Sequence, residues 1–263
     1  MLSSKTRTDI AREAFLKKDK NLALSAHKKG FIASSINHKE GHKTSFSLPE
    51  IILGGQDGLV NVLGIILGVG AATSDSRIVI IAGLAATFAE SVSMGAVAYT
   101  SKLAEADYYQ SEYEREKWEI ENMPEGEKDE IRNLYKKLGF AGKLLDDIVR
   151  QITSNKETWL EAMMTQELKL EPVVRKEALG DGIIVGISAL IGSFIPLTAF
   201  FFLSVRSATI LSLVVSSVTL FIVGYYKAKV TLGRSLIKQG IEMMAIGMVS
   251  ALVGYLVGSL FKI

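Results

Sequence analysis

The chain has 263 residues, of which 48% are hydrophobic and 22% are charged, and its formal net charge is +2. It contains no cysteine, which excludes disulfides, cysteine-ligated zinc and thiol catalysis. The charges are unevenly distributed: residues 1–50 hold ten Lys and Arg against five Asp and Glu, whereas residues 102–177 hold thirteen against eighteen. The stretches between and after these segments are nearly uncharged, so the composition predicts a membrane protein with a sizeable soluble part.

The first 48 residues form a polar, basic arm in which we expect a helix over residues 8–30. A basic segment can bind nucleic acid or anionic lipid, but beside membrane spans it is typical of a cytosolic topology signal, and we expect no nucleic-acid partner. All three histidines, His27, His38 and His42, lie in this arm. A loose loop is a poor metal site, so we assign no metal to them.

Five apolar blocks are each long enough for the roughly 20 residues that a bilayer core requires. Span 1 covers about 50–72, and Pro49 suits the first turn of its helix. Span 2 begins near Arg77, and its apolar part ends near Tyr99. The last three spans are expected at about 176–203, with a kink at Pro196, at 207–226 and at 235–261.

A polar helical insert separates spans 2 and 3. No glycine or proline follows Gly95 before Pro124, so the helix of span 2 should project beyond the membrane by several turns. Further helices are expected from Pro124 to Gly139, at 142–153 and at 156–171. The fold class is therefore all-α and polytopic, with a basic arm (1–48), spans 1 and 2 (49–103), a cytosolic helical metal-binding domain (104–173) and spans 3–5 (174–263).

The orientation follows from the positively charged residues. Most Lys and Arg lie in the arm, the insert and the segment between spans 4 and 5, whereas the opposite side holds only Arg77, Arg206 and Lys262. The positive-inside rule then places the N-terminus in the cytosol and the C-terminus outside.

Four acidic residues fall within or beside the spans. Asp181 and Glu242 lie near the predicted cytosolic boundary, where water can hydrate them. Asp57 and Glu90 lie deeper, where a charged side chain costs roughly 2.5–3.5 kcal/mol on insertion scales. Because carboxylates at that depth line water-filled paths, bind cations or shuttle protons, we assign Asp57 and Glu90 to a transport path.

The insert carries a series of acidic residues at helical spacing. Like charges one turn apart destabilise a helix, so they require solvent, neighbouring cations such as Arg115 and Lys117, or a bound metal. Carboxylates with nearby thioethers suit Fe²⁺, Mn²⁺, Co²⁺ or Zn²⁺ better than Ca²⁺. The candidates on shared helix faces are Glu105, Glu112, Glu116, Glu119, Glu127, Glu130, Met163, Met164 and Glu167.

Several segments in fixed order resemble the vacuolar iron transporter family, from about Leu48 to the C-terminus. They include DGLVNVLGIILGVGAAT, AGLAATFAESVSMGAVAYTSKLAEADYY, WLEAMMTQELKLEP and GIEMMAIGMVSALVGYLVG. The resemblance implies a five-span protomer in a homodimer, with the ion path between the two copies of span 1. It further implies that divalent metal leaves the cytosol in exchange for protons.

The same resemblance assigns individual residues. Asp57 corresponds to the path carboxylate of span 1 and Met94 to the path methionine of span 2. The implied cytosolic metal ligands are Glu116, Glu119, Glu127, Glu130, Met163, Met164 and Glu167. This chain departs from plant members at Ala86, where they have a glutamate, and has Glu90 one turn closer to Met94.

We therefore expect a transporter of ferrous iron and other divalent metals, with protons, the lipid bilayer and a second copy of the chain as partners and no cofactor. An alternative is a membrane protein that senses metal through its acidic helices without transporting it. An oxidising enzyme of ferritin type is disfavoured because the insert contains no histidine and hence no Glu-x-x-His motif, so we expect no enzyme. The plasma membrane of a prokaryote is the expected location.

Overall fold

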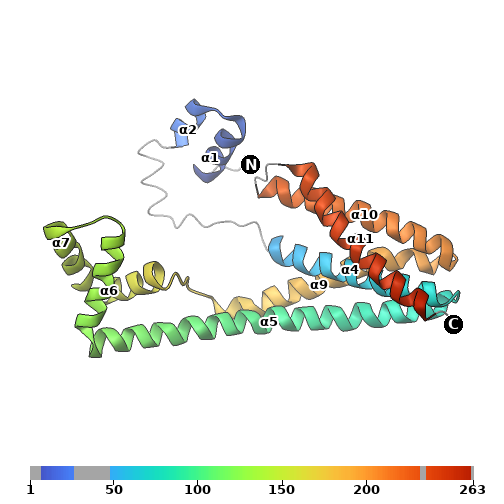
Figure 1. The fold of residues 1–263 in the computed structure, drawn as a ribbon, viewed down its shortest axis with the longest axis horizontal. Helices are drawn as coiled ribbons and strands as arrows, with labels where there is room; N and C mark the ends of the chain where they lie inside the picture. Colours follow the sequence, from blue (N-terminus) through green and yellow to red (C-terminus); the bar gives the residue numbers. More distant parts are fainter. Residues whose placement is uncertain (1–6, 27–47, 232–234, 262–263) are drawn as a thin grey trace, which may run out of the picture. The chain divides into compact units, whose positions relative to one another are not determined.

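The computed structural model describes residues 7–26, 48–231 and 235–261, and all regular structure in these ranges is helical (Figure 1). This confirms the predicted all-α class. The three histidines lie outside the described residues. The chain divides into two compact units, Met1–Ser91 with Ile187–Ile263, and Val92–Gly186. The second unit contains the whole predicted metal-binding segment, but the predicted domain boundaries themselves stay a prediction.

Within the described ranges, five helical segments are long and apolar enough to cross a membrane, as predicted. They are α4 (Leu48–Ala72), α5 (Ser76–Asn122), the segment Arg175–Phe201, α10 (Val205–Val230) and α11 (Leu236–Leu260). The third segment consists of the 3-10 turn η2 (Arg175–Glu177), α9 (Ala178–Leu197) and the 3-10 turn η3 (Thr198–Phe201). The α-helical part ends one residue after Pro196, because proline lacks the N–H that an α-helix requires.

Small residues let the membrane helices of the first unit approach closely. α4 packs against α11 and α10. A Cβ atom on Gly68 would lie 2.8 Å from the carbonyl oxygen of Gly254, so the two backbones are in direct contact there. Gly58 similarly faces the backbone of Ala189 on α9. Glycine at these crossings therefore provides the close van der Waals packing that drives helix association in lipid.

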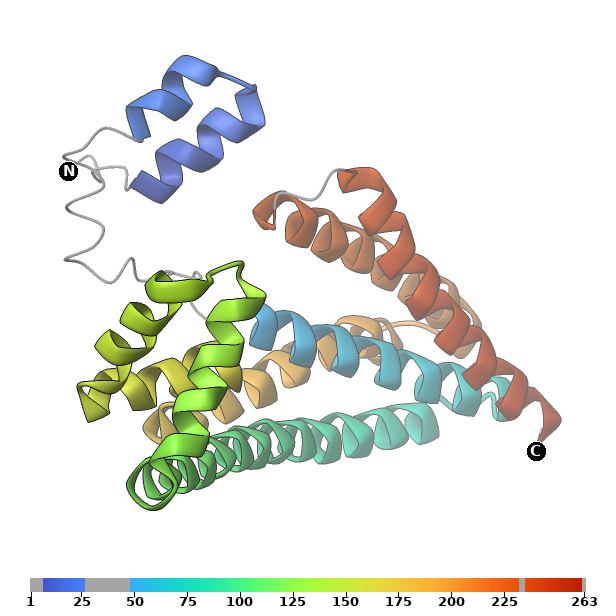
Figure 2. The ribbon, with the colours of Figure 1, turned by 60° about the vertical axis from the view of Figure 1, so that its left-hand side comes forward.

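The second unit contains the polar helices. α5 is continuous over 47 residues, as predicted, and is followed by α6 (Pro124–Lys137), α7 (Gly142–Thr153) and α8 (Lys156–Ala162) (Figure 2). Gly139 has φ +96°, a left-handed conformation that ends the α6 segment as expected. These helices share a hydrophobic core that includes Ile131, Val149 and Trp159.

Two predicted helices differ from those observed. The helix expected over 156–171 is α-helical only to Ala162 and continues as a π-helical turn, η1 (Met163–Glu167), whose hydrogen bonds include Leu168 N–H to the carbonyl of Met163. The helix expected over 8–30 is two helices, α1 (Arg7–Lys17) and α2 (Lys20–Ala26), broken at Lys18 with φ 54°. The carboxylate of Asp19 accepts hydrogen bonds from two backbone N–H groups at the start of α2, which makes the break favourable.

Candidate metal-binding centre

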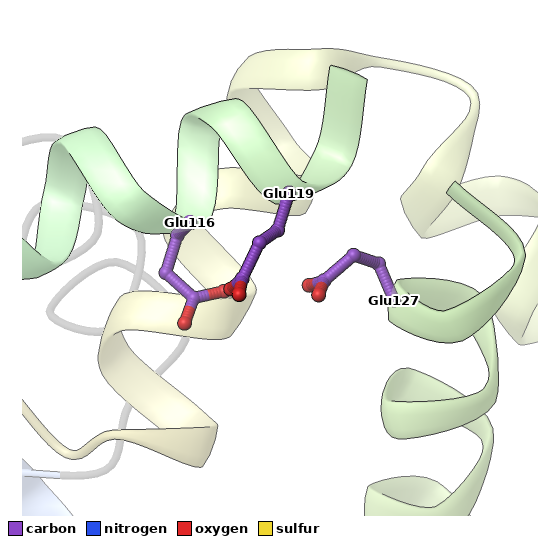
Figure 3. A group of neighbouring side chains, drawn as sticks. All are labelled: Glu116, Glu119 and Glu127. Carbon is purple, nitrogen blue, oxygen red and sulfur yellow. The ribbon is translucent and has the colours of Figure 1, made fainter. Parts of the chain in front are cut away.

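Three glutamates from two helices of the second unit converge on one point. Glu116 and Glu119 project from α5 and Glu127 from α6, and their carboxylates point toward one another (Figure 3). One carboxylate oxygen from each residue lies within 4.8 Å of the other two. Pro124 begins α6 directly after α5 ends at Asn122, so the chain turns sharply and places the first turn of α6 beside the last turns of α5.

The cluster is partly withdrawn from solvent. Glu116 is 2% exposed and Glu127 is 5% exposed. One oxygen of each, Oε2, is buried and has no hydrogen-bond partner among the described residues. A buried polar atom without a partner costs free energy, which a cation bound between these oxygens would recover. The burial of Glu116 and Glu127 contradicts the alternative of a fully solvated acidic helix face.

Arg115 supplies the neighbouring positive charge. Its guanidinium lies 2.8 Å from Glu112 and 2.6 Å from Oε1 of Glu116, and it also donates to Glu119. Arg115 therefore pairs with three carboxylates. Glu127, by contrast, has no salt bridge among the described residues. Because Arg115 contacts Oε1 of Glu116, it fixes that carboxylate while the buried Oε2 stays available.

Burial and mutual repulsion change the proton affinity of these carboxyl groups. Burial raises the pKa of Glu127 to about 8, and the negative charges of Glu116 and Glu130 add to the effect. Burial also raises the pKa of Glu167, with a further contribution from hydrogen bonding to Glu130. A divalent cation at this centre would therefore displace protons as it binds.

The other predicted ligands differ in their surroundings. Met163 and Met164 are buried in the hydrophobic core of the unit. Glu167 ends the same π-helical turn and lies close to Glu130. The assignment of these four residues as metal ligands stays a prediction.

The remaining acidic candidates lie outside the cluster of three. Glu112 pairs with Arg115. Glu105 has a largely exposed side chain and lies 3.5 Å from Lys102, as expected for a solvated surface pair. Asp181 is half-buried and Glu242 is exposed, and neither belongs to the cluster. A role of these four residues in metal binding stays a prediction.

A second polar group lies within the membrane helices of the first unit. The side-chain nitrogen of Asn61 on α4 donates to Oδ2 of Asp57 at 3.3 Å and to Oε1 of Glu90 on α5. Met94 is half-buried and lies one turn beyond Glu90 on α5, whereas Ala86, one turn before, packs against an apolar cluster. Sequence reasoning missed Asn61, although its position one turn after Asp57 in an apolar span is a usable signal.

The model of the VIT family matches residues 48–259, which is most of the chain. The chain belongs to the VIT family. The resemblance inferred from the sequence is thereby confirmed.

Three relatives illustrate the similarity. The "Vacuolar iron transporter" of Plasmodium falciparum is 34% identical over 274 residues, covering 100% of this VIT-family chain and 98% of the relative. The protein of the same name from Toxoplasma gondii is 34% identical and covers 96% and 88%, respectively. "Vacuolar iron transporter 1" of Arabidopsis thaliana is 32% identical and covers 82% and 86%. These relatives are named as transporters and not as enzymes, in agreement with the prediction that this chain is not an enzyme.

Proposed function

We propose that this VIT-family chain carries ferrous iron, and related divalent ions such as Mn²⁺, Co²⁺ and Zn²⁺, out of the cytosol in exchange for protons. The proposal rests on the glutamate centre, which is the cluster of Glu116, Glu119 and Glu127. Two buried carboxylate oxygens of this centre lack a partner among the described residues. The five spans and the relatives named as iron transporters support the same function.

The glutamate centre acts as a capture site. Glu116, Glu119 and Glu127 offer hard oxygen ligands, and the raised pKa of Glu127 makes binding a competition between metal and protons near neutral pH. Glu130, Glu167, Met163 and Met164 complete the proposed ligand set, and the thioethers favour transition metals over Ca²⁺ and Mg²⁺.

The membrane carboxylates form the path. Asp57, Glu90 and Met94 bind the ion between the two sides of the bilayer, and the two carboxylates exchange protons for it. In the proposed homodimer the two copies of α4 face each other across this path. We place the N-terminus and the capture site in the cytosol and the C-terminus outside, in the plasma membrane of a prokaryote.

Metal flux into vesicles under an imposed pH gradient tests the proposal, with the wild type compared to Asp57→Asn. The substitution keeps the shape of the side chain and removes its charge, so we expect flux of Fe²⁺ or Mn²⁺ to be lost. Metal binding by the glutamate centre should persist, because its ligands come from other segments. Wild-type protein that binds metal but gives no flux would refute transport and support the sensing alternative. Wild-type flux in Asp57→Asn would show that the path avoids α4.

A further inference from the structure

Asn61 lies near the middle of the apolar helix α4. At a rise of 1.5 Å per residue, it is about 20 Å along α4 from Leu48, and Glu90 is about 21 Å along α5 from Ser76. The two helices are joined by a short turn at residues 73–75 and run in opposite directions. Both side chains therefore lie near the middle of their apolar spans, where lipid offers no alternative hydrogen-bond partner.

The amide of Asn61 connects two carboxylates from different helices. Its nitrogen carries two N–H groups, and the structure has one acceptor for each, Asp57 on the same helix and Glu90 on α5. Within the described residues, neither carboxylate has a salt bridge to Lys or Arg. Within the described residues of the first unit, the charged side chains on the helices packed against α4 are Arg206, Lys227 and Lys229 on α10, Lys238 and Glu242 on α11, and Arg77 on α5. None of them forms a described hydrogen bond or salt bridge with Asp57 or Glu90.

The surroundings of Asn61 are otherwise apolar. It lies at a groove of about 530 Å³ between α4 and α11 whose other lining residues, apart from Ser250, are glycines and aliphatic side chains. The two carboxyl groups also contact each other, and the amide of Asn61 is the neutral N–H donor that reaches both of them. A neutral donor can hold them together without the repulsion that a Lys or Arg would exert on an incoming cation.

We propose that Asn61 is the positioning residue of the transport path, which holds Asp57 and Glu90 together as one binding unit for the transported divalent cation. This inference rests on the proposed transport function. The inference also explains why this chain has Ala86 where plant members have a glutamate. The carboxylate of Glu90 reaches the amide of Asn61, whereas Ala86 packs into an apolar cluster.

The test measures Mn²⁺ flux in proteoliposomes as a function of Mn²⁺ concentration for wild type, Asn61→Leu, Asn61→Gln and Gln56→Leu. Asn61→Leu removes the donor that holds the two carboxylates together, so we expect the KM for Mn²⁺ to rise about tenfold with a smaller change in the maximal flux. Asn61→Gln keeps both N–H groups and should restore most of the flux. Gln56 is an amide on α4 that lines a different cavity, so Gln56→Leu should behave as wild type.

A double substitution separates positioning from general damage. In a Glu90→Gln background, Asn61→Leu should raise the KM for Mn²⁺ no further, because one of the two carboxylates that Asn61 holds together is already lost. If Asn61→Leu does not fold, as judged by size-exclusion chromatography, Asn61→Ala is measured in its place. A wild-type maximal flux and KM in the Asn61 variant, or an equal rise of the KM in the Glu90→Gln background, would overturn the inference. Absence of flux in the wild type would instead refute the proposed function.

Discussion

At the scale of single residues, the glutamate centre and the membrane pair Asp57 and Glu90 differ in the group that donates hydrogen bonds to their carboxylates. At the glutamate centre, Arg115 pairs with Glu116 and Glu119, whereas burial and the neighbouring negative charges raise the pKa of Glu127. In the membrane group, the neutral Asn61 is the donor. Both arrangements leave net negative charge available, which is what a site for a divalent cation requires.

We predict that Glu127 makes the stability of the metal-free protein depend on pH. Its folded pKa of about 8 exceeds the ordinary value of 4.5, so the folded state holds a proton that the unfolded state has released. The stabilisation is complete below about pH 4.5 and is lost as pH rises to about 8. The melting temperature measured with a chelator should therefore fall between pH 5 and pH 8, and Glu127→Gln should reduce this fall.

Glu125→Gln is the matched control, because Glu125 lies on the same helix with a largely exposed side chain that pairs with Lys128. Calorimetric titration with Mn²⁺ at pH 8 should give affinity at least about tenfold weaker for Glu127→Gln and unchanged affinity for Glu125→Gln. Equal affinities for wild type and Glu127→Gln would exclude Glu127 from the metal site.

At the scale of helices, glycines set how closely the membrane segments approach. Gly64 and Gly68 on α4 face Gly254 and Gly258 on α11. A Cβ on Gly68, Gly254 or Gly258 would lie 2.8 Å or less from a carbonyl oxygen of the opposite helix, whereas a Cβ on Gly64 would make ordinary contact with Ser250 at 3.7 Å. Gly126 on α6 is different, since a Cβ there would meet nothing within 4 Å. The same residue type is therefore required at the membrane crossings and replaceable in the polar helix.

We predict opposite effects of the same substitution at these two places. Gly254→Ala should destabilise the protein by about 1–3 kcal/mol, because the added methyl group must push two backbones apart. Gly126→Ala should stabilise it by about 0.5–1 kcal/mol, because alanine restricts the unfolded chain and favours the helix. Thermal unfolding in detergent measures both, and a stabilised Gly254→Ala protein would show that α4 and α11 do not pack as described.

At the scale of the whole molecule, the uneven charge distribution predicts the topology. The basic arm and the mixed-charge insert belong on the cytosolic side, and five spans put the two ends on opposite sides. A reporter fused after Ile263 should report the outside, and one inserted between residues 124 and 155 should report the cytosol. Reporters on the same side would mean that one of the five apolar helices does not cross the membrane.

The sequence by itself determined the helices, the five spans and the family. These depend on local properties: the length of apolar runs, the breaks at Pro124 and Gly139, and ordered motifs such as the one around Asp57. The predicted extent of the helix that begins at Lys156 was wrong, because helix propensity alone does not predict the π-helical turn at Met163.

Only the tertiary structure decided which polar residues form groups. Spacing placed Glu116 and Glu119 on one helix face, but burial of Glu116 and its approach to Glu127 depend on how α6 folds back on α5. Likewise, Asn61 and Glu90 are 29 residues apart and meet because α4 and α5 pack side by side. Contacts between residues distant in the chain arise when helices pack together. The periodicity of residues along one helix gives no information about which helix packs against it.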